Sequence, residues 1–235
     1  MNSPTHKPLG WEPLQAGGHT PVLLVRHAQT AWNRERRMLG RSDIPLDEVG
    51  RAQAAALAAW LAPVPLASIS SSPLSRAMQT AQALAEPRGL PVRPLEGLRE
   101  LDQGELEGRP FQELLSEYAT FFAAFRADPV TTCVPGGESL GACQRRAWEA
   151  LEAALVEAEP GPPVALVVHQ MVLSGLLCRA LDLPLRHYSL LSQRNTAVNL
   201  LAWRDGQLRV VALNLCPHLP PPSSSAGSPR AAGSP

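Results

Sequence analysis

Lysine and net charge are nearly absent from this chain. Lys7 is the only lysine, and 21 basic residues against 21 acidic ones leave a formal net charge of zero. A chain without surplus positive charge has no bulk attraction for nucleic acid or an anionic membrane, so we predict neither as a partner. Any anion-binding site must therefore be local. The preference for arginine suits phosphate and carboxylate recognition, but a codon bias that also enriches Ala, Pro and Gly is the simpler explanation.

Cysteine is scarce as well, and long apolar runs are missing. The four cysteines form no CxxC pair and no cluster with histidine, which excludes a disulfide-stapled scaffold. Reduced thiols in the cytoplasm are the simplest interpretation. Residues 1–20 contain no continuous apolar segment of the kind a secretory signal carries, and no apolar run is long enough to span a bilayer. We therefore expect a cytoplasmic protein.

The ends of the chain differ in composition from its middle. Residues 217–235 consist mostly of Pro, Ser, Gly and Ala, a composition that buries too little apolar surface to offset the entropy of ordering. We predict a disordered tail there and a loose extension over residues 1–20. Residues 21–216 then form one domain, and the 45% of hydrophobic residues in the chain provide ample material for its core.

Between the ends, strand-like and helix-like segments alternate. Short continuous apolar runs predict strands buried on both faces, and Asp205-Gly206 predicts a hairpin turn between the last two strands. This alternation predicts a three-layer α/β/α sandwich with a mostly parallel central sheet and one antiparallel edge strand. We expect strands at 21–25, 66–71, around Val92, 164–168, 196–202 and 208–213, and helices at 50–61, 75–86, 111–126, 139–157 and 172–181.

Polar side chains follow four of these strands, where ligands of such sheets bind. The first strand ends in Arg26 and His27, and the fourth ends in His169. The second leads into Arg76 and the third into Glu100. Each of these residues alone is more often structural than functional, but five of them from four segments in the same position predict a shared site.

Two arginine forks and two imidazoles make a cationic cradle that suits a phosphoryl group. The sequence contains no carboxylate cluster for Mg²⁺, no HxxxH or cysteine set for Zn²⁺, and no GxxxxGK[ST] loop. We therefore predict no metal and no cofactor, with the necessary charge supplied by arginine and histidine. A neutral histidine can attack phosphorus and carry the phosphoryl group, and a carboxylic acid can protonate the leaving alcohol.

Six stretches of the chain, in this order, resemble the histidine phosphatase superfamily, the phosphoglycerate mutase-like proteins of branch 1. The resemblance covers roughly residues 22–213. The pair RHxxTxWN and SSxLxRAxQTA is its most specific part. The stretches are LLVRHAQTAWN (23–33), GRSDIPLDEVGRAQA (40–54), SSPLSRAMQTA (71–81), LRELDQGELEG (98–108), PGGES (135–139) and VVHQMVLSGLL (167–177).

The resemblance implies a division of roles among the five residues at the strand ends. His27 would be the nucleophile that becomes phosphohistidine. Glu100 would donate a proton to the leaving group and then activate water. Arg26, Arg76 and His169 would bind and neutralise the phosphoryl group, with Arg26 and His169 counted as catalytic.

The resemblance also points to four further residues that bind the substrate. Asn33 would add a polar contact from the first loop. Gln29 and Thr30 lie in the same loop and would help to shape the phosphate pocket. Gln170 stands where glycine is usual in the family, so its side chain would narrow the pocket or touch the substrate.

The segment after Glu100 bears on the reaction. Similar cofactor-dependent mutases carry a longer and more basic insertion there, which holds a second anion. Here residues 109–135 are short and contain only Arg126 beyond Arg109. We therefore predict a phosphomonoesterase for a small phosphate ester, in preference to a cofactor-dependent phosphoglycerate mutase. A binding module that has kept the fold and lost catalysis is the least favoured alternative.

Two other features leave their roles open. The same segment is aromatic, with Tyr118 and four phenylalanines, and these rings either cover an apolar substrate or anchor a helix to the core. Arg145 and Arg146 are adjacent on a helix, so at most one points inward, where it could reach an anionic substrate. The oligomeric state also stays open between a monomer and a homodimer.

Overall fold

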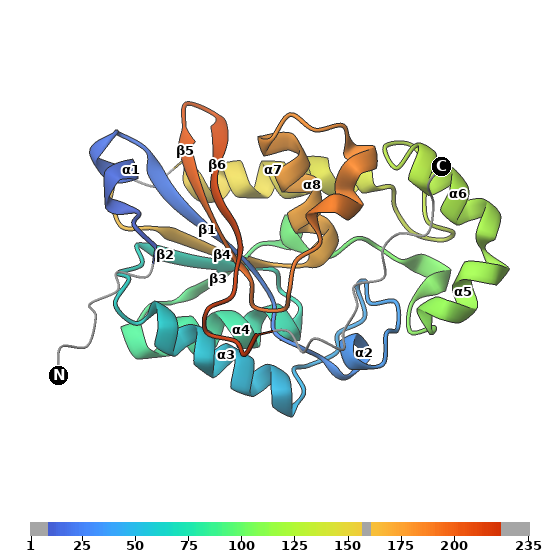
Figure 1. The fold of residues 1–235 in the computed structure, drawn as a ribbon, viewed down its shortest axis with the longest axis horizontal. Helices are drawn as coiled ribbons and strands as arrows, with labels where there is room; N and C mark the ends of the chain where they lie inside the picture. The colour runs from blue at the N-terminus through green and yellow to red at the C-terminus, as the bar shows by residue number, and fades with distance from the viewer. Residues whose placement is uncertain (1–8, 157–160, 222–235) are drawn as a thin grey trace.

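The computed structural model describes residues 9–156 and 161–221, in which six strands form one sheet in the order β3-β2-β4-β1-β5-β6. The first four strands in this order run parallel, β5 runs against β1, and β6 forms the edge as the second arm of the hairpin. The predicted fold class is confirmed, with the antiparallel pair at one edge (Figure 1). The strands are β1 (Thr20–Arg26), β2 (Ser68–Ser71), β3 (Val92–Pro94), β4 (Val164–Val168), β5 (Val198–Arg204) and β6 (Gln207–Leu215).

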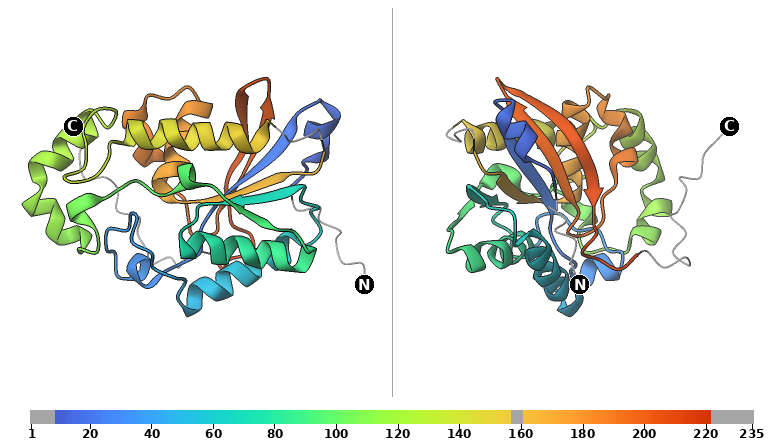
Figure 2. Two further views of the ribbon diagram at one scale, coloured as in Figure 1. Left: turned by 180° about the vertical axis from the view of Figure 1, so that it is seen from behind. Right: turned by 60° about the vertical axis from the view of Figure 1, so that its left-hand side comes forward.

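Helices cover both faces of the sheet, as the alternating side chains of β1 require. Val22 and Leu24 face the core formed with α7 (Leu140–Leu155) and α8 (Gln170–Ala180). Leu23 and Val25 face the core formed with α3 (Glu48–Leu61) and α4 (Ser75–Ala85). The two cores give the three layers seen from behind and from the side in Figure 2.

Local signals in the sequence account for several boundaries. The side chain of Asp47 accepts a hydrogen bond from the Gly50 amide and begins α3. The predicted cap Ser139 does the same for α7 through the Ala142 amide. Asp205 and Gly206 both have positive φ, as the tight turn of the β5–β6 hairpin requires.

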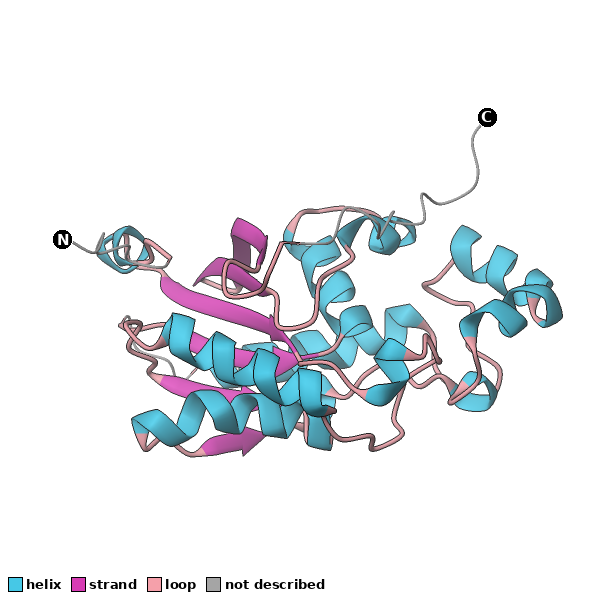
Figure 3. Ribbon diagram, turned by 60° about the horizontal axis from the view of Figure 1, so that its bottom comes forward, coloured by secondary structure: helices cyan, strands magenta, loops and turns pink. Residues whose placement is uncertain are grey.

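The predicted helix over 111–126 is two helices, α5 (Phe111–Glu117) and α6 (Ala119–Ala127). They meet at Tyr118, whose φ of −109° and ψ of 30° interrupt the helical path. Both helices project beyond the carboxyl ends of the strands (Figure 3). The remaining short elements are α1 (Glu12–Ala16), α2 (Ala31–Arg34), η1 (Glu86–Arg88), η2 (Glu96–Leu98), η3 (Gly104–Leu106) and η4 (Leu185–Leu191).

The described parts of both chain ends pack onto the domain. Of the expected loose extension, residues 1–8 lie outside the described residues, while Trp11 and Leu14 pack against the core beneath α3 and α4. Of the expected tail, residues 222–235 lie outside the description. His218 before them stacks on Trp60 at 5.2 Å between ring centroids and contacts the Thr196 hydroxyl at 3.0 Å. Within the described residues, no helix has both the length and the apolarity needed to cross a bilayer.

Candidate active site

His27 lies just past the end of β1 with only 3% of its surface exposed. Its Nδ1 is 2.6 Å from the Ala28 carbonyl oxygen, which can only accept a hydrogen bond. Nδ1 therefore carries the ring hydrogen and Nε2 keeps a free lone pair. Burial, together with Arg76 and Arg26, lowers the pKa of His27 well below 6.5. A neutral imidazole with a free lone pair is the nucleophilic form of histidine.

The backbone on both sides of His27 is fixed by other segments. The Ala28 amide donates to the Thr80 hydroxyl at 3.0 Å, and that hydroxyl donates to the Arg76 carbonyl at 2.7 Å. From the loop before β5, the Asn195 side-chain amide donates to the His27 carbonyl at 3.0 Å. His27 is thus held between α4 and the start of the antiparallel hairpin.

Two arginines are oriented toward His27 by backbone carbonyls. Arg26 donates through one terminal nitrogen to the Gln193 carbonyl at 2.5 Å. Arg76 is fully buried and donates to the carbonyls of Ser42 at 2.9 Å and Gly40 at 2.6 Å. Because these acceptors are neutral, they hold the guanidinium groups in place without cancelling their charge.

The side chains around His27 leave polar atoms without partners. In the part of the chain that the structure describes, Arg26 Nε, Arg76 Nε and both ring nitrogens of His169 are buried and make no hydrogen bond. The His169 ring lies 5.1 Å from that of His27, centroid to centroid. Buried donors without acceptors are costly, so this set fits an oxyanion bound between the two histidines.

Glu100 closes the site from the other side and is 4% exposed. One carboxyl oxygen accepts from the amides of Leu101 at 2.8 Å and Val172 at 3.3 Å, and the other accepts from the Met171 amide at 3.1 Å. Burial raises the pKa of Glu100 despite these amides and the nearby arginines. A carboxyl with a raised pKa holds its proton to a higher pH than an ordinary glutamate, which suits a general acid.

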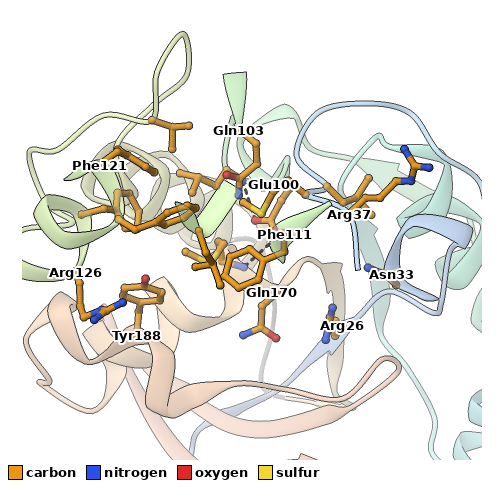
Figure 4. Close-up of a pocket in the computed structure, with 18 of the residues that line it drawn as sticks. Arg26, Asn33, Arg37, Glu100, Gln103, Phe111, Phe121, Arg126, Gln170 and Tyr188 are labelled. Carbon is orange, nitrogen blue, oxygen red and sulfur yellow. Dashed lines mark hydrogen bonds between the residues drawn. The ribbon is translucent and has the colours of Figure 1, made fainter. Parts of the chain in front are cut away.

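The site opens into a cavity of about 370 Å³. Figure 4 shows Arg26 and Glu100 toward one end and Phe121, Tyr188 and Arg126 toward the other. The apolar side chains in its wall are Met38, Leu39, Leu101, Phe111, Leu115, Phe121, Phe122, Phe125, Val134 and Met171.

The rings of the aromatic segment anchor a helix and also line the cavity. Phe125 is only 5% exposed and packs edge-on against Tyr188 with centroids 5.8 Å apart, so it anchors α6. Phe111 is 39% exposed and lines the cavity from α5. The rings therefore fix the two helices and, at the same time, make the cavity wall apolar.

The four further residues predicted to bind substrate divide into two pairs. Asn33 and Gln170 line the cavity, as expected. The Thr30 side chain instead caps α2 in a reciprocal box with Asn33, and the Gln29 side chain donates to Asp47 at 3.1 Å. Both side chains build the loop around the pocket, so a direct contact of Gln29 or Thr30 with the substrate stays a prediction.

Gln170 has a second role that its position in the sequence does not reveal. Its amide nitrogen donates to the Ser174 hydroxyl at 2.9 Å, and its oxygen accepts from the Gln193 amide at 3.0 Å. The Gln193 carbonyl is the acceptor for Arg26. Gln170 therefore connects the start of α8 to the loop that orients Arg26.

Several supporting groups were missed by sequence reasoning. Thr80 lies inside the stretch at 71–81, so the resemblance could have indicated it. Gln193 and Asn195 lie in a loop without periodicity, and the carbonyls of Gly40 and Ser42 have no side-chain signal. Among residues 9–156 and 161–221, no group of three or more His, Cys, Asp or Glu side chains is placed to hold a metal ion.

The geometry agrees with the comparison to known families. The family model of the histidine phosphatase superfamily (branch 1) matches residues 22–215. The chain belongs to this superfamily. Members of the superfamily are phosphatases and mutases, so membership identifies the chain as an enzyme of phosphoryl transfer without deciding between these two activities.

Similar members of the superfamily come from several bacteria. A protein of Yersinia pestis (strain Pestoides F) named probable phosphoglycerate mutase GpmB is 36% identical over 184 residues, which cover 78% of this chain and 85% of that protein. The structure of Bacillus stearothermophilus YhfR is 34% identical with a TM-score of 0.79, and the match covers 85% of this chain and 98% of that one.

Two superfamily structures are named for their substrates. A mycobacterial glucosyl-3-phosphoglycerate phosphatase is 31% identical with a TM-score of 0.74, covering 83% of this chain and 99% of that one. A putative alpha-ribazole-5'-P phosphatase from Escherichia coli str. K-12 substr. MG1655 is 27% identical with a TM-score of 0.74, covering 83% and 96%. The relatives thus include one probable mutase and two phosphatases.

The unpartnered donors predict that the site binds inorganic phosphate. Arg26→Ala should weaken phosphate binding by roughly 10-fold or more, because a hydrogen bond to a charged group contributes about 1.5–3 kcal/mol. Isothermal titration of inorganic phosphate into wild type and variant measures this. The exposed Arg145 provides the matched control, and Arg145→Ala should bind phosphate as wild type does. Equal losses in both variants would contradict the assigned site.

Proposed function

We propose that the protein is a metal-independent phosphomonoesterase that acts through a phosphohistidine intermediate at His27. The observation that carries the proposal is the hydrogen bond from His27 Nδ1 to the Ala28 carbonyl. It leaves the Nε2 lone pair free beside the unpartnered nitrogens of Arg26, Arg76 and His169.

In the first step, His27 Nε2 attacks phosphorus, the N–P bond forms and the bond from phosphorus to the alcohol oxygen breaks. Glu100 donates its proton to that oxygen, so the product leaves as a neutral alcohol. The charge on the phosphoryl oxygens is met by Arg26, Arg76 and His169. These groups are already in place, so little reorganisation accompanies the transfer.

In the second step, the ionised Glu100 accepts a proton from water, and the water oxygen attacks phosphorus. The N–P bond breaks, inorganic phosphate leaves, and both His27 and Glu100 return to their starting forms. The raised pKa of Glu100 suits both roles, because the same carboxyl must hold a proton in one step and take one in the next.

The cavity wall favours water over a second phosphorylated molecule as the acceptor. Beyond the phosphate end the lining is mostly apolar. Of its two outer cations, Arg37 is already paired with Glu35 at 2.8 Å, which leaves Arg126. We infer that the substrate is a small phosphate ester whose alcohol has an apolar or planar body. The named relative from Yersinia pestis keeps a cofactor-dependent mutase as the second candidate.

The cellular setting belongs to the proposal as well. Zero net charge supports neither nucleic acid nor membrane as a partner. All four cysteines are free in the structure, as reduced thiols in a cytoplasmic enzyme would be. We propose a cytoplasmic enzyme without a metal or cofactor.

A phosphoenzyme assay tests the central step. With 4-nitrophenyl phosphate and EDTA present, wild type should turn over and form an acid-labile phosphoenzyme. His27→Ala should abolish both, because no other group replaces the Nε2 lone pair. His19→Ala is the matched control and should keep full activity, since His19 lies in the loop before β1. Turnover by the His27→Ala protein at the wild-type rate would exclude the mechanism.

The pH dependence of kcat/KM tests the acid. Because the pKa of His27 lies well below 6.5, its protonation should limit the rate only at distinctly acidic pH. Because burial raises the pKa of Glu100 above 4.5, the rate should fall as the pH rises through that raised value. Dividing kcat/KM of wild type by kcat/KM of Glu100→Gln for the same substrate cancels the effect of the substrate's own ionisation. This ratio should decline with rising pH, and a constant ratio would disprove the assignment.

A phosphate-release screen tests the substrate class. We expect kcat/KM for 1-naphthyl phosphate to exceed that for glycerol phosphates by about tenfold or more, because burying an aromatic body adds roughly 25 cal/mol per Å². Phe121→Ala should reduce this preference and leave activity on glycerol phosphate nearly unchanged. Phosphoglycerates are assayed with and without 2,3-bisphosphoglycerate. Mutase turnover faster than phosphate release would favour the second candidate.

A further inference from the structure

We propose that Arg146, held by Glu138, is the positioning residue for the general acid Glu100. Arg146 lies on α7 and points inward, whereas its neighbour Arg145 is exposed. The inference rests on the proposed function, because it concerns the proton that Glu100 gives to the leaving group. Its basis is a set of hydrogen bonds that joins α7 to the backbone on both sides of Glu100.

Every donor of the Arg146 guanidinium is used inside the protein. Nε donates to the Glu138 carboxylate at 3.1 Å, and one terminal nitrogen donates to the carbonyls of Gly97 at 2.8 Å and Arg99 at 2.5 Å. The other terminal nitrogen donates to the Glu100 carbonyl at 2.9 Å and again to the Glu138 carboxylate. A guanidinium has five N–H groups, so all five are occupied. Of the roles that the sequence left open for Arg146, contact with an anionic substrate is therefore not the one the hydrogen bonds support.

Glu138 extends the clamp to the far side of the acid. The Glu138 carboxylate accepts from Nε and one terminal nitrogen of Arg146, and also from the Asp102 amide at 3.0 Å. Burial on its own would raise the pKa of Glu138, but the hydrogen bonds and charge of Arg146, the Asp102 amide and the charge of Arg41 together lower it, so the carboxylate stays ionised. Arg146 and Glu138 therefore hold the backbone carbonyls up to and including that of Glu100, and the amide of Asp102 beyond it.

The backbone around Glu100 is shaped to fit this clamp. Gly97 packs so closely on α7 that a Cβ atom there would lie 2.7 Å from the Arg146 carbonyl oxygen. Only η2 and irregular backbone lead into residue 100, so the chain has no strand partner to set its position. Arg146 supplies three of the missing constraints from α7, while the amides of Met171 and Val172 hold the carboxyl from α8.

The position of the acid matters because proton transfer depends steeply on geometry. A carboxyl displaced by about 1 Å can lose on the order of 100-fold in rate. Such a loss falls only on substrates whose leaving group needs the proton. A poor leaving group such as phenolate depends on the acid strongly, whereas 2,4-dinitrophenolate leaves readily without it. This difference separates positioning of the acid from general damage to the site.

The test compares kcat/KM for phenyl phosphate and 2,4-dinitrophenyl phosphate. Arg146→Lys keeps the charge but has three donors in place of a planar fork, and Glu138→Gln removes the charge that holds Arg146. We expect each variant to lose about tenfold more activity on phenyl phosphate than on 2,4-dinitrophenyl phosphate, in the direction shown by Glu100→Gln. The affinity for inorganic phosphate should stay at the wild-type value. Arg145→Lys, on the same helix, should match wild type on both substrates.

Three results would overturn the proposal. Equal losses on the two substrates would make the clamp merely structural. Weaker binding of inorganic phosphate would make Arg146 a substrate ligand. Wild-type behaviour of both variants would leave Glu100 positioned without the clamp. Arg146→Lys can unfold at a markedly lower temperature than wild type. In that case, the two substrates are compared with Glu138→Gln, at a temperature below the melting transitions of wild type and of this variant.

Failure of the proposed function is distinguishable from failure of the clamp. Absence of wild-type turnover on 2,4-dinitrophenyl phosphate would overturn both. Wild-type turnover with no leaving-group dependence in Glu100→Gln would remove the acid from Glu100, and the clamp with it. A clear leaving-group effect in Glu100→Gln that is missing from both clamp variants would overturn the clamp alone.

Discussion

The enclosure of two charged arginines, the buried Arg76 and the partly buried Arg26, with the buried His27 and His169 is the constraint on which the rest of this structure depends. Burial lowers the pKa of each arginine to about 10, so both remain charged at neutral pH. Burial and the positive charge of the two arginines lower the pKa of both imidazoles well below 6.5, which keeps the rings neutral. Such a cluster is tolerated because backbone carbonyls and the carboxyl of Glu100 face it, and the anion that we propose as its ligand would complete it.

The topology explains how distant residues meet in this cluster. β2, β4 and β1 are neighbours in the sheet and run parallel, so their carboxyl ends converge (Figure 1). His27 follows β1, His169 follows β4, and Arg76 is on the helix after β2. The antiparallel β5 begins at the same edge, and the loop before it supplies the carbonyl that holds Arg26. The residues proposed as catalytic and their supports therefore come from both parts of the mixed sheet.

Two parts of the chain divide the work of the site. The strand ends carry the proposed phosphate-binding groups, and their geometry is set by the core of the sandwich. The segment from Phe111 to Ala127 projects beyond that core and lines the cavity in which we propose that the alcohol binds. Leu114 and Phe125, which are almost fully buried in that core, anchor the segment to it.

Local features of the sequence predicted several strands, helix starts and turns of the fold. Apolar runs predicted the buried strands β1 and β4, and cap and turn residues such as Ser139 and Asp205 predicted where elements begin and reverse, because these signals are local. The positions after the strands predicted the five site residues, and the resemblance in ordered motifs indicated the family. The two-helix form of 111–127 was missed, since nothing in the residues around Tyr118 marks a break.

The partners of individual side chains depended on packing between segments far apart in the chain. The sequence does not show that the Gln29 side chain donates to Asp47 or that the Thr30 side chain caps α2. Arg146 could not be told from a substrate ligand until its five donors were found on Glu138 and the backbone around Glu100. Residue type and spacing determine which groups are available for chemistry. Which acceptor each donor meets is decided by tertiary contacts, because a hydrogen bond requires its two atoms within about 3 Å and sequence spacing carries no such distance.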